Sequence, residues 1–285
     1  AACRVCLHDF MLNAAGLVAG PDSDPIEAVH QGRIALRRLR AAFALFRPII
    51  RDNSFARMNA ELKWLAGVFG AARDRDVMSL NAATADRFEA GDAKGFFTWL
   101  ENRRLTAHRT VVRATRSKRW RIFLIDFCEW IDGGAWRDSV GGRKDDMRRF
   151  VRKRLKKRRD ALLEKGRDLE SLAHEARHNA RIIAKKLRYA AQFFARLPQV
   201  ADPGQMEQLL DGLDELQAAL GELQDEQARL AAARADIIAW RKAVGEADPA
   251  AIAAAERWAA PALNGDKQLN KAADAYAKVA RAKPF

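Results

Sequence analysis

The chain has 285 residues, of which 49% are hydrophobic and 31% charged, and its 51 Lys and Arg exceed its 37 Asp and Glu to give a formal net charge of +14. This composition excludes a disordered chain, since it supplies enough apolar side chains for one or two cores. Only 17 Gly, eight Pro and two Tyr are present, which argues against an all-β fold and favours helix. Three cysteines are too few for a disulfide framework, and no apolar segment reaches the roughly 18 residues that span a membrane, so we expect a soluble cytoplasmic protein without a membrane partner.

Helix start and stop signals recur along almost the whole chain. Asp24 precedes Pro25 in the manner of an N-cap before the first helical residue, which predicts a helix over 26–47 that ends before Pro48. Further helices are predicted to begin near Ser54 and Asp92 and to cover 118–132, 143–166, 171–197, 203–242, 249–258 and 267–282.

An internal repeat is the most informative feature. The segment HQGRIALRRLRAAFALF at 30–46 aligns without a gap with HNARIIAKKLRYAAQFF at 178–194, and LxxLxxxFGxxRD at 62–74 recurs as LxxLxxxLGxxQD at 213–225. Two segments repeated in the same order indicate a duplicated helical unit. We therefore expect an all-α fold of two similar bundles related by a pseudo-twofold axis, covering 1–135 and 136–285, with their boundary in the Gly-rich stretch 132–142.

The repeated helix carries a stripe of cations. At about 100° per residue, Arg33, Arg37 and Arg40 fall with His30 in one stripe about 80° wide that contains no acid and has apolar residues on both sides. The second copy places Arg181, Lys185 and Arg188 in the same way. Cations between apolar walls are costly unless an anion neutralises them, so two facing stripes would form a basic groove or pore for a polyanion.

Two less specific explanations of the stripe remain open. Arg-rich helices are often ordinary solvated faces. Alternatively, Asp74, Asp76 and Asp225 could pair with the stripe arginines; we expect one acid per repeat to orient the bases and to leave most of the charge for a ligand.

The motifs HxxRxxxRRLR at 30–40, GxxRDxD at 70–76 and HxxRIxxKKLRY at 178–189 resemble the CHAD family of histidine-containing α-helical domains over nearly the whole chain. This resemblance implies two four-helix bundles around a basic central pore, binding of inorganic polyphosphate, and location on polyphosphate granules. It also implies a frequent fusion behind a CYTH triphosphatase domain, which would fit the absence of an initiator Met. The second GxxRDxD copy departs from the pattern, because Gln224 and Gln227 replace its Arg and its last Asp.

The resemblance assigns phosphate contacts to matching positions in both copies. The polyphosphate-binding residues expected from the motifs are His30, Arg33, Arg37, Arg38, Arg40, Arg73, His178, Arg181, Lys185, Lys186 and Arg188. Bases outside the repeat should widen the positive field and steer polyanions: Arg109, Arg113, Lys153, Lys157 and Arg158. The histidines, with an ordinary pKa near 6.5, would become cationic beside phosphate and strengthen binding at mildly acidic pH, unless each is a neutral hydrogen-bond donor between helices.

Metal binding and catalysis have weak support. The segment from His174 to His178 has HExxH spacing, but adjacent arginines would repel Zn²⁺, and Cys3-x-x-Cys6 is only half of a zinc ribbon. A Gly-rich phosphate loop and clustered carboxylates are absent from the sequence. We therefore expect a non-catalytic chain without metal or cofactor.

Nucleic-acid binding is the main rival, since a basic helical surface also binds phosphate backbones. Against sequence-specific recognition, the stripes lack aromatic side chains for base stacking, and the Asn and Gln that read bases are sparse.

Overall fold

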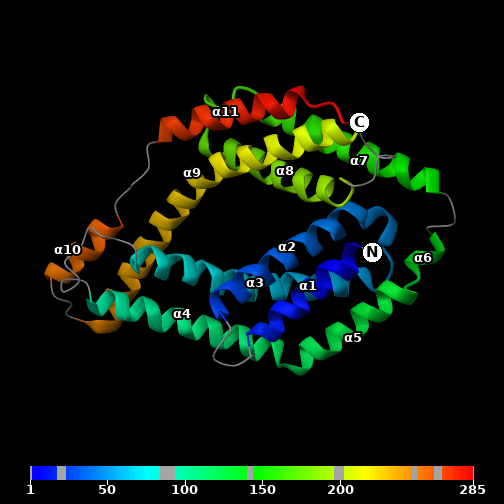
Figure 1. Cartoon of the computed structure of the whole chain (residues 1–285). Helices are drawn as coiled ribbons and strands as arrows, with labels where there is room; N and C mark the ends of the chain where they lie inside the picture. The colour runs from blue at the N-terminus through cyan, green and yellow to red at the C-terminus, as the bar shows by residue number, and fades with distance from the viewer. Residues whose placement is uncertain are drawn as a thin grey trace. The chain divides into compact units, whose positions relative to one another are not determined.

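The computed structural model describes residues 2–17, 24–83, 94–139, 144–195, 202–245, 249–259 and 265–284. Within these ranges the chain is all-α, as predicted, with ten helices of at least ten residues and one single-turn helix (Figure 1). They are α1 (Ala2–Gly16), α2 (Pro25–Ile50), α3 (Phe55–Ala83), α4 (Lys94–Thr115), α5 (Lys118–Gly133), α6 (Trp136–Ser139), α7 (Lys144–Lys165), α8 (His174–Gln192), α9 (Pro203–Val244), α10 (Pro249–Trp258) and α11 (Gly265–Arg281).

Helix α2 begins as its sequence predicts and ends three residues later than expected. The Asp24 side chain accepts hydrogen bonds from the backbone N–H groups of Ile26 and Glu27 at 2.9 and 3.1 Å, so the predicted N-cap is confirmed. The helix then continues past Pro48 to Ile50. Pro48 has no backbone N–H, so the helix loses one hydrogen bond there. Ile50 is buried, and its packing compensates for this loss in the last turn.

Helix α1 and the single-turn helix α6 are the described helices that the sequence signals did not predict. Helix α1 is the longer of the two. It has no acid in its first turn and no base in its last, yet it buries Cys6 and Phe10. The Phe10 ring contacts Phe69 of α3 and Trp120 of α5 at centroid distances of 5.0 and 5.3 Å. These tertiary contacts hold a helix that lacks local capping signals.

The chain forms two compact units. Unit 1 comprises Ala1–Ser139 with Arg229–Pro261, and unit 2 comprises Val140–Ala228 with Ala262–Phe285. The long helix α9 contributes its first part to unit 2 and its last part to unit 1. Residues 229–261 thus belong to the first unit. The division at residue 135 that we predicted from the sequence places them in the second.

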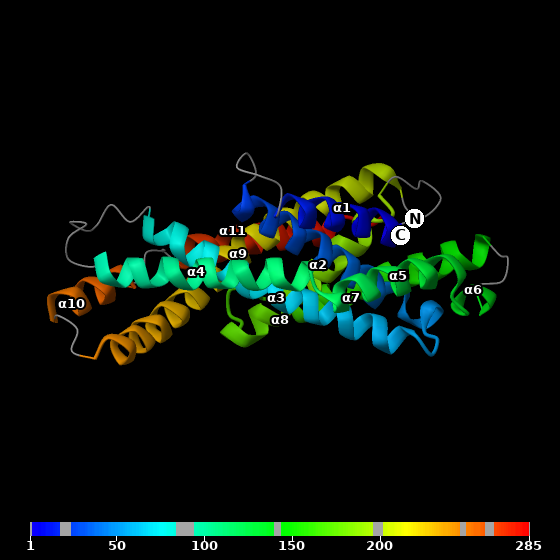
Figure 2. The ribbon, with the colours of Figure 1, turned by 90° about the horizontal axis from the view of Figure 1, so that it is seen from below.

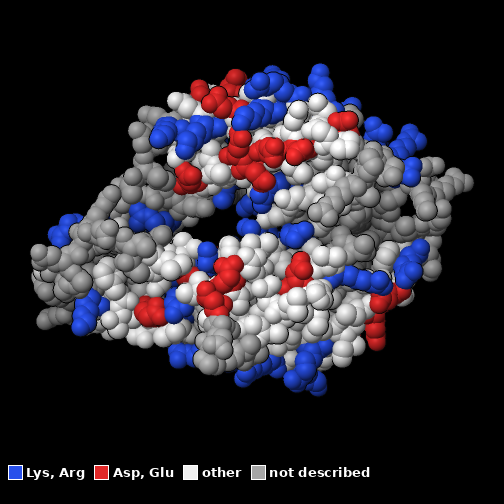
Figure 3. Space-filling model, in the orientation of Figure 1, with Lys and Arg blue, Asp and Glu red and all other residues white. Residues whose placement is uncertain are grey.

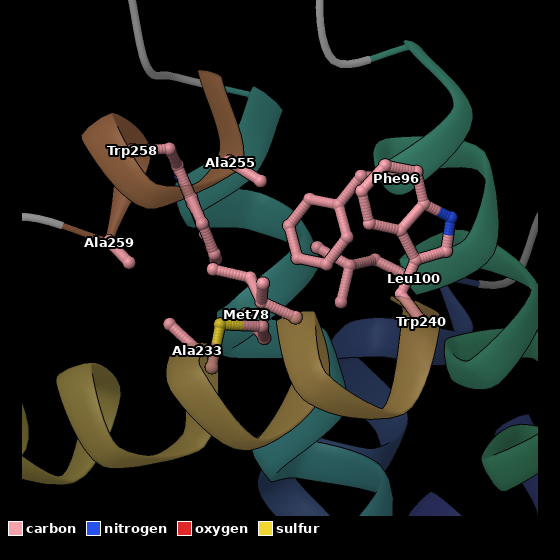
Figure 4. Close-up of a cluster of buried hydrophobic side chains, with 9 residues drawn as sticks. Met78, Phe96, Leu100, Ala233, Trp240, Ala255, Trp258 and Ala259 are labelled. Carbon is pink, nitrogen blue, oxygen red and sulfur yellow. The ribbon is translucent and has the colours of Figure 1, made fainter. Parts of the chain in front are cut away.

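Among the described residues of unit 1, hydrophobic side chains pack together around α2 and again around α10. In the first group, α1, α2 and α3 pack side by side, as Figures 1 and 2 both show, and Phe43 of α2 stacks on Phe127 of α5 at 5.6 Å. The second group joins α3, α4, α9 and α10 (Figure 4). Its buried members are Met78, Phe96, Leu100, Ala233, Ile237, Trp240, Ala255, Trp258 and Ala259.

In unit 2, α7 packs against α8, and side chains of α11 reach both α7 and the first part of α9. The Tyr276 hydroxyl of α11 donates a 2.6 Å hydrogen bond to the Leu163 carbonyl of α7. On its other side, Lys278 of α11 forms an ion pair with Glu215 of α9 at 2.6 Å. Each of these four helices also contributes buried apolar side chains, among them Leu155, Leu187, Leu213 and Val279.

We predict that Phe10→Ala lowers the free energy of unfolding by about 3–5 kcal/mol, because it opens a cavity beside two aromatic rings. Val5→Ala on the same helix is the control; its side chain is 55% exposed, so the change should stay below about 0.5 kcal/mol. Urea unfolding midpoints measure both variants. Equal midpoints would mean that α1 does not pack as described.

Candidate anion-binding site

Helix α2 places its cations beside the core of unit 1. Its core face buries Val29, Leu36, Leu39 and Phe43, while Leu45 on the opposite border of the stripe is also fully buried. Between these borders, His30, Arg33 and Arg37 are half-buried and Arg40 is exposed. Arg38 is also half-buried, but it lies beyond the border that Leu45 marks. Apolar residues therefore border the stripe on both sides, with Ile34 on the second border partly buried. The half-buried cations distinguish the stripe from a fully solvated face.

Helix α3 brings a further cation and an acid to the stripe. Asp74 places a carboxylate oxygen 3.8 Å from Nη2 of Arg33, and the Asp74 side chain is 73% exposed. At Gly70, an added Cβ would lie only 2.5 Å from Nη1 of Arg33, so the guanidinium rests against the backbone of α3. Arg38 instead turns toward α1, where it lies 3.9 Å from Asp9.

The imidazole of His30 lies in a positive field. Burial and the charges of Arg73, Arg37 and Arg33 lower the pKa of His30, and the opposing effect of Glu27 is smaller than that of Arg73. Side chains from two helices therefore act on one histidine. We call His30, Arg33, Arg37 and Arg73 the His30 cluster.

In unit 2, α8 carries the second copy of the stripe. His178, Arg181 and Lys185 are half-buried, and Lys186 is exposed. Arg188 is hydrogen-bonded to Asp214 of α9. Sequence reasoning missed this acid, because a partner 26 residues away on another helix leaves no local signal.

A small hollow lies between α8 and α9 within unit 2. It is lined by His174, Arg177, His178, Arg181, Leu220 and Leu223. His174 and Arg177 were not among the expected phosphate ligands. They lie one helical turn before His178 and Arg181, which were. The Arg177 guanidinium donates to the Leu172 carbonyl at 2.6 Å, which fixes its direction at the start of α8.

The bases predicted outside the repeat differ in their surroundings. Lys153 and Lys157 are exposed on α7, whereas Arg158 donates to the Lys186 carbonyl of α8 at 3.3 Å. Burial and the charge of Arg154 lower the pKa of Arg158, which nevertheless stays cationic at neutral pH.

On α4, Arg109 and Arg113 are exposed and donate to hydroxyls of their own helix. Arg109 bonds Thr106 at 2.9 Å, and Arg113 bonds Thr110 at 3.3 Å. These bonds direct both guanidiniums along α4.

Asp76 does not pair with the stripe arginines, so that hypothesis is wrong for this residue. Its side chain is fully buried, its Oδ1 lies 2.6 Å from Nε2 of His108 on α4, and Arg104 approaches the same oxygen at 3.7 Å. Six positions separate Asp76 from Gly70, which turns it roughly 120° around α3 and toward α4. The side chains of Asp225, Gln224 and Gln227 lie outside the described residues.

The arrangement gives no support to a metal site. Among the described residues, His, Cys, Asp and Glu side chains form no group of three or more that could hold a metal ion. Burial and the charge of Cys6 raise the pKa of Cys3 to about 12, which disfavours the thiolate that metals bind. Among the residues that the structure describes, no helix is long and apolar enough to cross a membrane.

Figure 3 shows that Lys and Arg share one face of the molecule with patches of Asp and Glu. On the part of the surface that this view describes, the positive charge is thus unevenly distributed. Local groups of side chains, rather than the net charge, therefore decide which parts of this face are positive.

Comparison with known proteins agrees with the motifs. The family model of the CHAD domain matches residues 1–236. The crystal structure of the CHAD domain from the plant Ricinus communis is similar, with a TM-score of 0.74 and 22% identity over 100% of this chain and 91% of the plant chain. PptA from Streptomyces chartreusis has a TM-score of 0.60 and 17% identity, covering 99% of this chain and 96% of its own.

At such identities these two likenesses support the fold alone, and no curated protein matches the sequence. The family match, by contrast, extends over most of the chain and includes both copies of the basic helix. The chain therefore belongs to the CHAD domain family.

Proposed function

We propose that this chain is a non-catalytic binding module for inorganic polyphosphate, held by the His30 cluster in unit 1 and by the corresponding residues of α8 in unit 2. The observation that carries the proposal is the His30 cluster itself. Arg33, Arg37 and Arg73 are all close enough to lower the pKa of one half-buried histidine. Such a field is unfavourable to a cation and favourable to an anion.

The side chains suit phosphate in particular. Guanidinium groups bind phosphate oxygens through two parallel hydrogen bonds, and partial burial strengthens these bonds relative to bulk water. A second copy of the stripe on the same chain gives a long polyanion a second attachment, which raises the overall affinity without any new kind of contact.

Polyphosphate binding would direct the protein to polyphosphate granules or present the polymer to a fused triphosphatase domain. Both consequences follow from the properties that the CHAD resemblance implies. The expected groove between two similar four-helix bundles stays a prediction, as do the individual phosphate ligands.

The decisive experiment compares polyphosphate with nucleic acid at one salt concentration. Labelled long-chain polyphosphate is bound to the protein and challenged with duplex DNA or with RNA at equal phosphate concentration. Polyphosphate should be retained, because the cluster offers phosphate contacts and few groups that read or stack on bases. Displacement by either nucleic acid would favour a general phosphate-backbone binder.

We predict that Arg37→Glu combined with Lys185→Glu weakens polyphosphate binding by at least about a hundredfold, since each lost charge-assisted contact costs about 1.5–3 kcal/mol. Fluorescence titration measures the affinity, and circular dichroism confirms retained helix.

The matched control for this double variant is Lys63→Glu combined with Lys271→Glu. Both lysines are exposed, one in each unit, and the control changes the net charge by the same amount. Equal losses in the two double variants would show that only the overall charge matters and would place the site elsewhere.

Affinity is also predicted to depend on pH through His30. The pKa of His30 is lowered in the ligand-free protein, whereas bound phosphate stabilises the imidazolium and raises it. Binding then takes up a proton, so affinity should rise as pH falls from about 8 to about 6 and level off below the ligand-free pKa.

This pH dependence should be measured with long chains, in which terminal phosphates that titrate near pH 6 are a small share of the ligand. The variant His30→Gln should reduce the slope. A flat profile in the unmodified protein would instead favour a neutral histidine that bonds between helices.

A further inference from the structure

Helices α2 and α3 approach closely at two adjacent positions, and at each position a glycine faces a large side chain of the other helix. A Cβ added to Gly32 of α2 would lie 2.6 Å from Cε1 of Phe69. One added to Gly70 of α3 would lie 2.5 Å from Nη1 of Arg33. Both glycines are buried. Consecutive residues of α2 thus interlock with consecutive residues of α3.

The two contacts serve different purposes. Phe69 is fully buried and packs on Phe10 at 5.0 Å, so Gly32 makes room for a core side chain. Arg33 is 35% exposed, and the exposed carboxylate of Asp74 lies 3.8 Å away. Gly70 therefore makes room for a cation at the edge of the core.

The second copy of the repeat separates these roles. Gly32 and Phe69 correspond to Ala180 and Leu220, so the second copy has a larger residue in place of the glycine and a smaller one in place of the phenylalanine. Arg33 and Gly70 correspond to Arg181 and Gly221, so the arginine and its glycine are the same in both copies. A glycine inside a helix lowers the stability of the helix by about 1 kcal/mol relative to alanine. The presence of the same arginine–glycine pair in both copies therefore calls for an explanation.

The neighbourhood of Gly221 agrees with this comparison. Gly221 is buried, and Arg181 of α8 lines one hollow together with Leu220 of α9. Arg181 and the residue that precedes Gly221 therefore border the same hollow.

We infer that Gly70 is a positioning residue for Arg33. Without a Cβ, residue 70 lets the guanidinium lie against α3, in the place from which it would contact a phosphate. An arginine that is already held loses less conformational freedom on binding. This inference rests on the proposed polyphosphate function for its ligand, and Gly221 has the same role toward Arg181.

The test compares Gly70→Ala with Gly67→Ala, one turn earlier on α3. Gly67 is exposed and has no atom within 4 Å of an added Cβ, so it is a matched control for helix propensity. Both variants should keep or raise the unfolding midpoint, because the side chain displaced at residue 70 is the flexible end of an arginine. Gly70→Ala should weaken long-chain polyphosphate binding about five- to tenfold, and Gly67→Ala should leave it unchanged.

A double-mutant cycle shows whether the effect passes through Arg33. In an Arg33→Ala background, Gly70→Ala should cause no further loss of affinity. An equal loss with and without Arg33 would overturn the inference. So would a Gly70→Ala variant that binds as tightly as the unmodified protein while Arg33→Ala weakens binding.

A second measurement does not depend on the ligand. The NMR order parameter of the Arg33 Nε–Hε group should be high in the unmodified protein and in Gly67→Ala, and low in Gly70→Ala. An unchanged order parameter in Gly70→Ala would overturn the positioning role. If the unmodified protein failed to bind polyphosphate, the proposed function would fail, and this measurement would still decide the role of Gly70.

Discussion

Repulsion among half-buried cations is the constraint on which the site of unit 1 depends. Like charges at short range repel, and partial burial removes some of the water that would screen them. The lowered pKa of His30 is the local sign of this cost, because burial and three arginines all disfavour the imidazolium. The other face of α2 offsets the cost, since Val29, Leu39 and Phe43 are almost fully buried against neighbouring helices. The core thus holds the cations together in spite of their repulsion.

Most acids of unit 1 that form strong contacts are engaged away from the His30 cluster. Asp76 is bound by His108 and Arg104 of α4. Asp236 of α9 pairs with Arg75 of α3 and lies 3.8 Å from Arg103. These pairs link helices on the other faces of α3, so these two acids stabilise the fold away from the cluster. Glu27 and the exposed Asp74 are the acids that act on the cluster itself.

Consecutive bases on α3 show how helix geometry sorts these roles. Arg73 acts on His30, whereas Arg75, two positions later and about 200° around the helix, bonds Asp236 of α9. The two arginines contribute equally to the net charge. Their different functions follow from the faces of α3 on which they lie.

Features encoded within a few residues could be predicted from the sequence, and features that depend on distant contacts could not. The cap at Asp24 and the apolar borders of the α2 stripe follow from local spacing, and both are present. Helix α1 lacked such signals and is held by Phe10 packing on two other helices. The partner of Asp76 is 32 residues away on α4, so its orientation could not be read from α3 alone.

The internal repeat predicts two equal stripes, but their acidic neighbours make them chemically unequal. In unit 1, Asp74 is 73% exposed and lies 3.8 Å from Arg33, a geometry in which solvent weakens the ion pair. In unit 2, Asp214 is directly hydrogen-bonded to Arg188 at the opposite end of the stripe. Lys185 and Lys186 also replace Arg37 and Arg38, and lysine binds phosphate as a flexible point charge without the paired geometry of arginine. The duplication therefore repeats the order of cations along the helix, while the type of each cation and its acidic partner differ between the two copies.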